Sequence, residues 1–266
     1  MLKREYKYLV PNEKIDELRD AIRPFVNLDG YADITSKKEY TVRSIYLDNS
    51  SLKFYNEKLD GLQNRKKLRI RGYNEQGINS IIFLEIKRKF ENNIYKNRTS
   101  GYFETLEDFL LNGNSEYFVV NANKDEIENA NKFLFHYKIK MLKPVSLIVY
   151  DREAYFSKFD SNTRITFDKN LRYSSMPSFN LLYNEEILKL AMKNFFVLEI
   201  KFYRGYSQLL QKVLRQFNLA RLAVSKYQIC IDSDKFIAGP IQNKSFYFTS
   251  PATIEKIYSE EVFNYD

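Results

Sequence analysis

The stretch RKKLRIRGY at residues 65–73, followed by IIFLEIKRK at residues 81–89, decides how the fold is predicted. Successive side chains of a β-strand point to opposite faces of a sheet. In the first stretch, the cations therefore lie on one face and the apolar residues on the other. The cations are Arg65, Lys67, Arg69 and Arg71, and the apolar residues are Leu68 and Ile70. The second stretch repeats this separation, with Glu85, Lys87 and Lys89 on one face and Leu84 and Ile86 on the other. The two stretches predict a pair of antiparallel strands with one cationic face.

Like charges on one strand face repel each other, so this arrangement needs a physical reason. One strand of this kind is most often a solvated outer face. If the pattern recurs along the chain, an anion-binding face explains it better than repeated solvated surfaces. The remaining strands therefore decide between these two interpretations.

Composition favours one folded, β-rich domain. The chain has 266 residues, 44% of them hydrophobic, with 21 Tyr, 21 Phe, 8 Gly and 6 Pro. Aromatic residues favour strands, and this length is ordinary for a single β-rich domain. The net charge of +8 indicates a polyanionic partner, which could be nucleic acid, a phosphorylated metabolite or an anionic membrane surface.

The single cysteine, Cys230, excludes an internal disulfide framework, and its apolar surroundings predict a buried thiol. The N-terminal residues MLKREYKYLV contain no apolar signal-peptide region, and no run of about 18 apolar residues predicts a membrane span. We expect a cytoplasmic protein. The single histidine, His136, lies in an aromatic-rich helical segment, where a structural role is expected.

The separation of charged from apolar residues recurs along the chain. Alternation predicts strands over residues 3–10, 40–48, 145–156, 162–170, 196–203 and 222–231. Helical spacing predicts helices over residues 11–25, 106–111, 125–137 and from Gly205 to Phe217. Residues 90–103, with their Thr-Ser-Gly sequence, are interpreted as a charged segment containing a turn. Arg43 and Tyr46 fall on opposite faces of their strand, and the sequence leaves open which of the two is functional.

If the apolar faces pack outward against helices and the charged faces point inward, the sheet closes into a barrel with a cationic lumen. The predicted fold is α+β: a closed antiparallel barrel of about eight strands with helices outside. We expect a single domain over residues 1–266, with its core over 1–230, a helical insertion over 104–140 and an irregular tail over 232–266. Arginine and lysine suit a phosphate chain, since they offer bidentate forks and compact charges to phosphate oxygens.

Several short motifs carry a resemblance to a known superfamily. They are REYKYLV near the start, KLRIR, two E-x-K strands, DREAYF, TRITFD and SKY near the end. In their order and spacing, the chain resembles the triphosphate tunnel (CYTH-like) superfamily, and more closely the vacuolar transporter chaperone (VTC) domain, its polyphosphate polymerase branch. The resemblance implies an eight-stranded tunnel that binds ATP and a divalent metal, Mn²⁺ or Mg²⁺.

The resemblance also implies roles for individual residues. The residues expected to act directly on the transferred phosphate are Lys7, Arg69, Arg71 and Lys226. Further phosphate contacts are expected from Lys67, Lys87, Arg152, Arg164, Lys201 and Ser225. Glu199 is expected to hold the metal, with Glu5 and Glu85 as alternatives. The expected partners are ATP and inorganic polyphosphate or pyrophosphate, with no nucleic acid, and a membrane partner is left open.

One departure from the family pattern affects the expected reaction. Tunnel phosphatases typically begin with E-x-E-x-K, whereas this chain has Lys3, Glu5 and Lys7. Fewer carboxylates mean weaker control of a metal and of an attacking water, which favours a polymerase over a phosphatase. A tripolyphosphatase or nucleoside triphosphatase of the same fold, and a non-catalytic module that binds polyphosphate or RNA, remain alternatives.

Overall fold

The computed structural model describes residues 4–91, 93–160, 162–203, 205–219 and 221–234. The strands are β1 (Arg4–Pro11), β2 (Val26–Leu28), β3 (Tyr40–Asp48), β4 (Arg65–Tyr73), β5 (Ile81–Phe90), β6 (Asn93–Tyr102), β7 (Lys143–Ser157), β8 (Arg164–Ser175), β9 (Lys189–Leu190) and β10 (Phe195–Phe202). The α-helices are α1 (Ile15–Ile22), α2 (Gly30–Asp33), α3 (Lys53–Leu59), α4 (Leu106–Asn112), α5 (Ser115–Phe118), α6 (Lys124–Ile139), α7 (Gln208–Gln216) and α8 (Lys226–Asp232).

The predicted α+β class is confirmed, and the strands belong to one antiparallel sheet. Its order is β1-β10-β8-β7-β3-β4-β5-β6, with β2 beside β7 and β9 beside β8. Among the described residues, hydrogen bonds do not close this sheet from β6 back to β1. Closure into a barrel therefore stays a prediction. None of the described helices is long and apolar enough to cross a membrane.

The chain divides into two compact units. Unit 1 contains the described residues of Met1–Val42, Val149–Arg172 and Met192–Ser225, and unit 2 contains those of Arg43–Ile148, Tyr173–Ala191 and Lys226–Asp266. The organisation as one domain with a helical insertion stays a prediction. The predicted irregular tail lies outside the described residues from position 235 onward, as does Lys3.

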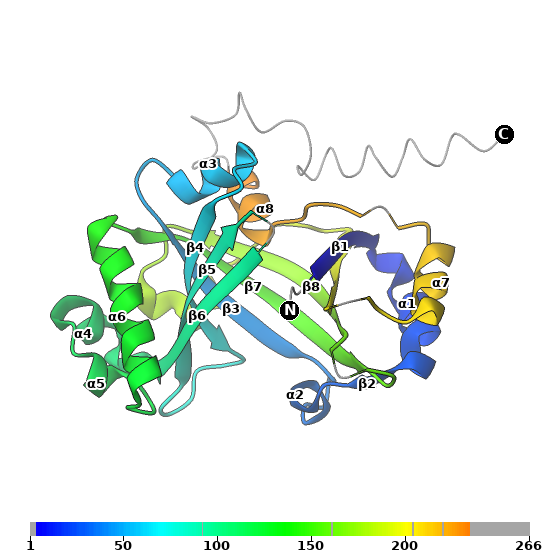
Figure 1. Ribbon diagram of the computed structural model, residues 1–266, viewed down its shortest axis with the longest axis horizontal. Coiled ribbons are helices and arrows are strands. Elements are labelled where there is room, and N and C mark those ends of the chain that lie inside the picture. The colour runs from blue at the N-terminus through cyan, green and yellow to red at the C-terminus, as the bar shows by residue number, and fades with distance from the viewer. Residues whose placement is uncertain (1–3, 92, 161, 204, 220, 235–266) are drawn as a thin grey trace. The chain divides into compact units, whose positions relative to one another are not determined.

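Unit 1 buries the apolar faces of β1, β8 and β10 against α1 and α7, which lie side by side (Figure 1). The cluster includes Val10, Ile165 and Leu198 from the strands, with Leu18 and Leu214 from the helices. In β1, Tyr8 and Val10 join this cluster, so Glu5 and Lys7 lie on the opposite face. The predicted alternation thus leaves the charged residues on the face away from these helices.

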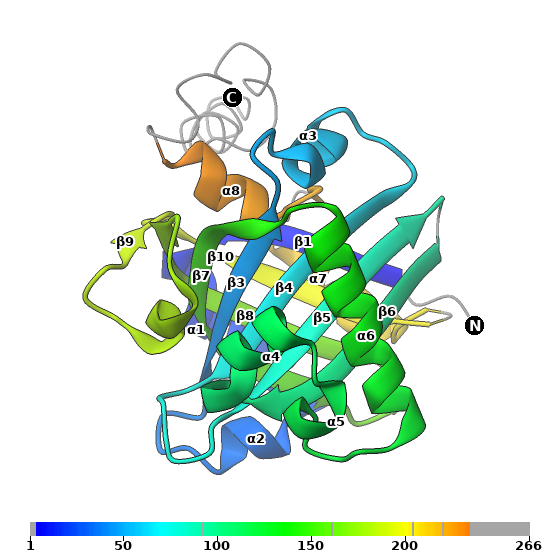
Figure 2. The same ribbon diagram turned by 90° about the vertical axis from the view of Figure 1, so that its left-hand side faces the viewer.

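Unit 2 follows the same principle with β4, β5 and β6. The side chains of Leu68, Ile70, Leu84 and Ile86 are buried, and α6 lies along β5 and β6 (Figure 2). The pair β4–β5 is antiparallel as predicted, with Arg69 opposite Glu85. Its charged face therefore lies opposite the face that contains the apolar residues.

The expected turn within residues 90–103 is wrong, because Asn93–Tyr102 forms strand β6, paired with β5 along its length. The Thr-Ser-Gly sequence looks like a turn, but Gly101 is part of the strand for a packing reason. A Cβ atom on Gly101 would come within 2.1 Å of the Phe118 ring. Glycine lets the ring pack directly on the strand backbone.

The last predicted strand, over residues 222–231, is also wrong, because Lys226–Asp232 forms helix α8. Tyr227, Gln228, Ile229, Cys230 and Ile231 are all buried. A helix that is buried on every side shows no polar face, so its sequence cannot be distinguished by periodicity from a buried strand. Cys230 is a buried thiol as predicted, and its burial raises its pKa well above the ordinary range.

Candidate functional site

A charged face of unit 2 is built by alternate residues of β4, β5 and β6. The register places Lys67 opposite Lys87 and Arg69 opposite Glu85, and Arg98 follows opposite Glu85 on β6. The predicted cations of these strands therefore gather around one carboxylate. We call this set the Glu85 cluster: Lys67, Arg69, Arg71, Glu85, Lys87, Lys96 and Arg98.

Glu85 is 1% exposed and forms ion pairs with four cations. Its carboxylate oxygens lie 2.6 Å from Arg69, 4.0 Å from Arg71, 2.5 Å from Lys96 and 3.5 Å from Arg98. Burial alone would raise the pKa of Glu85, but Arg69, Arg71 and Lys96 outweigh it and hold the pKa well below its ordinary value. Glu85 is thus an ionised centre that holds these cations together.

Lys96 and Arg98 of β6 were not predicted as site residues, because their segment was interpreted as a turn. Alternation in NIYKNR, residues 93–98, would have placed both on the charged face. Burial and the neighbouring cations Arg69 and Arg98 lower the pKa of Lys96 to about 8, despite its ion pair with Glu85. A fraction of Lys96 is therefore neutral at a pH only slightly above neutrality.

Aromatic residues accompany the Glu85 cluster and answer the question about β3. Arg69 donates a hydrogen bond to the Tyr46 hydroxyl at 2.8 Å, and Arg71 donates one to Ser44 at 3.1 Å. Burial would raise the pKa of Tyr46, but Arg69, Arg71 and more weakly Lys226 lower it. Tyr46 therefore lies among the cations.

Arg43, on the opposite face of β3, is 3% exposed and forms an ion pair with Glu185. It also donates a hydrogen bond to the backbone carbonyl of Asn74. The sequence left open whether Arg43 or Tyr46 is the functional residue of β3. Arg43 contacts Glu185 and the backbone of Asn74, whereas Tyr46 contacts the cations of the Glu85 cluster.

Helix α8 belongs to the same face of unit 2. The Tyr227 ring stacks on Tyr46 at 4.9 Å between centroids, and the ammonium of Lys67 lies 5.5 Å from the Tyr227 ring. The Tyr227 hydroxyl donates to buried Asp48 at 2.9 Å, which fixes the start of the helix. This stacking places the first turn of α8, where Lys226 lies, next to the cations of β4.

Unit 1 has a second charged face, on β1 and β10. The register places Lys7 opposite Glu199 and Glu5 opposite Lys201. Lys7 lies 2.7 Å from Glu5 and 3.7 Å from Glu199, and Lys201 also forms an ion pair with Glu199. Glu199, at 4% exposed, is thus shared by two lysines. We call these four residues the Glu199 cluster.

The predicted arginines of unit 1 also have carboxylate partners. Arg152 contacts both oxygens of Asp168, at 2.6 and 2.8 Å, and both residues are buried. Burial would lower the pKa of Arg152, but Asp168 raises it well above its ordinary value. Arg164 donates to Asp29 at 2.8 Å and to the Tyr40 hydroxyl at 3.0 Å.

The segment that contains Ser225 contacts the Glu199 cluster. The ammonium of Lys7 donates to the backbone carbonyl of Val224 at 3.3 Å, and Ser225 is 7% exposed. The structure therefore gathers the predicted residues of unit 1 near β1 and β10, with Arg152 and Arg164 on β7 and β8. The roles of these residues stay predictions.

The carboxylates of the two clusters differ in how well they suit a metal. Within the described part of the chain, no group of three or more His, Cys, Asp or Glu residues could hold an ion alone. Glu85 already faces four cations, which disfavours a further positive charge. Glu5 and Glu199 both pair with Lys7, and Lys201 and Arg152 also act on Glu199, so this cluster offers two carboxylates where the Glu85 cluster offers one. A hard divalent ion there would need phosphate oxygens or water to complete its coordination.

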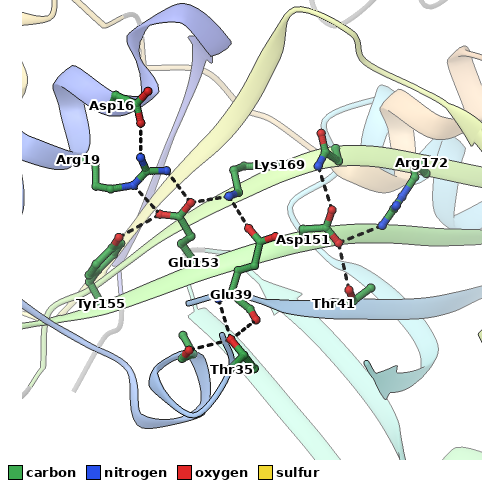
Figure 3. Close-up of polar contacts among 12 residues, drawn as sticks. Asp16, Arg19, Thr35, Glu39, Thr41, Asp151, Glu153, Tyr155, Lys169 and Arg172 are labelled. Atoms are coloured by element: carbon green, nitrogen blue, oxygen red, sulfur yellow. Dashed lines mark hydrogen bonds and ion pairs between the residues drawn. The ribbon is translucent and has the colours of Figure 1, made fainter. Parts of the chain in front are cut away.

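A third charged group, on the helix-covered side of unit 1, is neutralised internally. Figure 3 shows Glu153 of β7 accepting from Arg19 of α1 at 2.8 and 3.0 Å and from the Tyr155 hydroxyl at 3.0 Å. Lys169 also pairs with Glu153 and with Glu39 (Figure 3). Burial would raise the pKa of Glu153, but Arg19 and Lys169 lower it. These pairs attach α1 to the sheet, which is a structural role.

The VTC domain family matches residues 2–234. Among solved structures, the chain is similar to a putative adenylyl cyclase from Hippeastrum that is described as having a dominant triphosphatase activity. The two sequences are 14% identical, the match covers 86% of this chain and 94% of that chain, and the TM-score is 0.48. It is also similar to a chain of the Schizosaccharomyces pombe Mediator head module, with 10% identity, 82% and 92% covered, and a TM-score of 0.40. None of the curated proteins matches.

Proposed function

Because the chain belongs to the VTC domain family, we propose that it transfers the terminal phosphoryl group of ATP to a growing inorganic polyphosphate chain. The family supports a phosphoryl-transfer enzyme acting on triphosphates or polyphosphate. The proposal goes further in choosing a polymerase over a triphosphatase. It includes the closed tunnel predicted from the sequence and a cytoplasmic location.

The observation that carries this choice is the pairing of the carboxylates. Four carboxylates lie among the cations described above, and each forms an ion pair with at least one of them. These carboxylates are Glu5, Glu85, Asp168 and Glu199. A carboxylate held ionised by cations is a weak base, so none of the four is suited to remove a proton from water. A phosphate acceptor arrives already deprotonated, so its reaction needs no such base.

The proposed reaction transfers one phosphoryl group between two oxygens. An oxygen of the terminal phosphate of the chain attacks the γ-phosphorus of ATP, the bond from that phosphorus to the β,γ-bridging oxygen breaks, and ADP leaves with the electron pair. Positioning and neutralisation of charge supply most of the catalysis in such transfers. Arginine and lysine side chains can provide both, since they bind phosphate oxygens directly.

We assign the roles as the sequence predicted them. Contacts to the transferred group come from Lys7, Arg69, Arg71 and Lys226. Binding of the remaining phosphates involves Lys67, Lys87, Arg152, Arg164, Lys201 and Ser225. The ion pairs seen in each cluster support this assignment, because they hold the cations in place before a phosphate arrives.

The metal belongs to the same proposal. Glu199 would hold a divalent ion, Mn²⁺ or Mg²⁺, with Glu5 as its neighbour in the Glu199 cluster. When bound, such an ion neutralises charge on the phosphate oxygens. Glu199→Gln should remove most of the activity and leave the fold intact, and Glu85→Gln should reduce the metal dependence far less. If Glu199→Gln keeps full metal-dependent turnover, the metal is held elsewhere.

The decisive experiment incubates the pure protein with ATP and Mn²⁺ and follows both ATP loss and product length on a polyacrylamide gel. We expect long chains, after a lag that pyrophosphate or short polyphosphate shortens by acting as a primer. Two variants test the phosphate contacts. Arg69→Ala and Arg71→Ala should each weaken triphosphate binding by about tenfold to a hundredfold. Lys143 is an exposed residue at the start of β7, so Lys143→Ala is the matched control and should leave triphosphate binding unchanged.

One outcome would replace the polymerase with a triphosphatase. It is release of orthophosphate in proportion to the ATP consumed, with no chain longer than three phosphates at any primer concentration.

A further inference from the structure

Unit 2 has a second set of cations, around the start of β4 and the end of β5. They line a cavity of about 660 Å³ between α3, the start of β4, the end of β5 and the residue that follows α6. Glu57 is the one carboxylate among the residues that line it. The cations of this outer cavity are Lys53, Arg65, Lys66, Arg88, Lys89 and Lys140.

The strand register places like charges directly opposite each other beside this cavity. Lys66 lies opposite Arg88, and Arg65 lies opposite Lys89. Lys66 and Arg88 alternate with Lys67 and Lys87, so their side chains point to the other face of the sheet. Like charges directly opposite destabilise a pair of strands. Arg65 and Lys89, at the ends of these strands, share the face of Lys67 and Lys87. None of the residues assigned to phosphate contacts in the proposed function lines the outer cavity, so the two sites are composed of different side chains.

The cations of the outer cavity lack the carboxylate partners that other cations of this protein have. In the described part of unit 2, none of the six forms an ion pair with a carboxylate, whereas Glu85 alone pairs with four cations. The cavity of about 560 Å³ on the helix-covered side of unit 1 gives the contrast. Of the five cations that line it, Arg19 and Lys169 pair with Glu153 (Figure 3), Arg23 pairs with Asp20, and Lys38 pairs with Asp33. Four of the five cations in that cavity have a carboxylate partner, whereas none of the six in the outer cavity has one among the described residues.

Neighbouring groups respond to this uncompensated charge. Burial lowers the pKa of Lys66, the cations Lys140 and Arg88 lower it further, and Glu57 offsets this only in part. His136 of α6 shows the same pattern: burial lowers its pKa, and Lys66, Lys140 and Arg88 contribute in the same direction. The positive charge of the outer cavity therefore extends to the face of α6 that carries His136.

We propose that the outer cavity binds a phosphate chain of three or more groups. Six cations against one carboxylate favour a ligand with several negative charges in a small volume. A short phosphate chain concentrates its charge in this way, whereas an acidic peptide brings about one charge for each residue. Arg65 and Arg88 supply planar forks that match phosphate oxygens, and a volume of about 660 Å³ is typical of ligand sites.

The phosphate chain could come from inorganic polyphosphate or from a nucleoside triphosphate. Phe90 and Tyr95, each 53% exposed, line the same cavity, and Tyr95 lies opposite Arg88 on the neighbouring strand. Aromatic rings of this kind can stack on a base. Tripolyphosphate and ATP, used as separate ligands, distinguish the two sources.

The test reads the pKa of His136, the single histidine of the chain, by NMR titration with and without tripolyphosphate. An anion in the outer cavity offsets the charges of Lys66, Lys140 and Arg88, so tripolyphosphate should raise the pKa of His136. The double variant Lys66→Gln/Arg88→Gln should raise it without ligand and abolish the response to ligand. It should also weaken binding at this site by at least about tenfold.

The matched control is Lys67→Gln/Lys87→Gln. These residues are also directly opposite each other, one position along the same two strands, and they point to the other face. This variant removes the same charge and should keep the response of His136 to tripolyphosphate. Thermal melts check that both variants are folded at the temperature of the titration.

Two results would overturn the proposal. One is an unchanged pKa of His136 in the wild-type protein at saturating tripolyphosphate, and the other is a response that persists in Lys66→Gln/Arg88→Gln. Equal binding of ATP and tripolyphosphate supports an inorganic chain as the ligand. Tighter binding of ATP that Tyr95→Ala removes supports a nucleotide.

Discussion

The strongest test of the Glu85 cluster replaces Glu85 by Gln, which keeps the shape of the side chain and removes its charge. Removing one partner of a buried ion pair costs about 3–5 kcal/mol of folding free energy. The side chains of Lys96 and Arg98 are 42% and 39% exposed, so water screens part of the interaction. We therefore expect the lower end of the range, about 3 kcal/mol.

The assay is urea or thermal unfolding of wild type and variant. At about 2–4 °C for each kcal/mol in a chain of this size, the unfolding midpoint should fall by roughly 6–12 °C. Glu128→Gln is the control, since Glu128 is an exposed partner of Lys132 on α6, and its midpoint should not change measurably. A loss below about 1 kcal/mol in Glu85→Gln would refute the reasoning that one carboxylate holds this face together.

The same variant has a defined pH dependence. The pKa of Glu85 is lower in the folded protein than its ordinary value of 4.5, so its stabilising effect is complete above that pH. The effect declines as the pH falls below about 4.5, because the carboxyl of the unfolded chain then binds a proton while that of the folded protein is still ionised, and it is lost completely only below the lowered pKa. The difference in unfolding free energy between wild type and Glu85→Gln should therefore shrink in acid, which denaturation curves at several pH values would measure.

Three further predictions follow from single contacts. Gly101→Ala should lower the free energy of unfolding in urea by about 1–3 kcal/mol, because the new Cβ would overlap the Phe118 ring. Unchanged stability would contradict this reasoning, since it would mean that the ring moves aside freely. Asp168→Asn leaves the buried Arg152 guanidinium without its charge partner and should cost about 3 kcal/mol, measured in the same assay. Lys96, with a pKa of about 8, should react with amine reagents near pH 8 faster than ordinary exposed lysines, and mass spectrometry of labelled peptides would show it.

The alternation of charged and apolar residues predicted most of the strands correctly, because it follows from the geometry of the backbone. Leu68 and Ile70 are buried, and Arg69 lies on the opposite face, as the pattern requires. The same pattern could not identify the partners of these cations. The ion pairs of Glu85 with Lys96 and Arg98 depend on β6, whose pairing with β5 is a tertiary contact.

The two wrong secondary-structure predictions have different physical causes. In β6, local composition indicated a turn, and the packing of Phe118 on Gly101 overrode it. In α8, complete burial removed the periodicity that distinguishes a helix from a strand. For β6 the alternation in residues 93–98 is a usable local signal, whereas the packing of Phe118 on Gly101 and the burial of α8 are tertiary contacts that the local sequence does not contain.

The position of the carboxylates explains why one protein can have two cationic faces that behave differently. Glu85 offsets repulsion among Arg69, Arg71 and their neighbours, so this face is stable before any ligand arrives, but its charge also opposes an incoming phosphate. The outer cavity has one carboxylate, Glu57, against six cations, and within the described part of the chain Glu57 forms no ion pair with them, so a ligand there should relieve repulsion directly. Phosphate binding should thus stabilise Glu85→Gln more than wild type, because the ligand replaces the missing charge. Lys66→Gln/Arg88→Gln should be stabilised less than wild type, because its repulsion is already reduced. Thermal shifts with tripolyphosphate compare the two directly, and equal shifts in both variants would contradict the distinction between a self-compensated face and an uncompensated one.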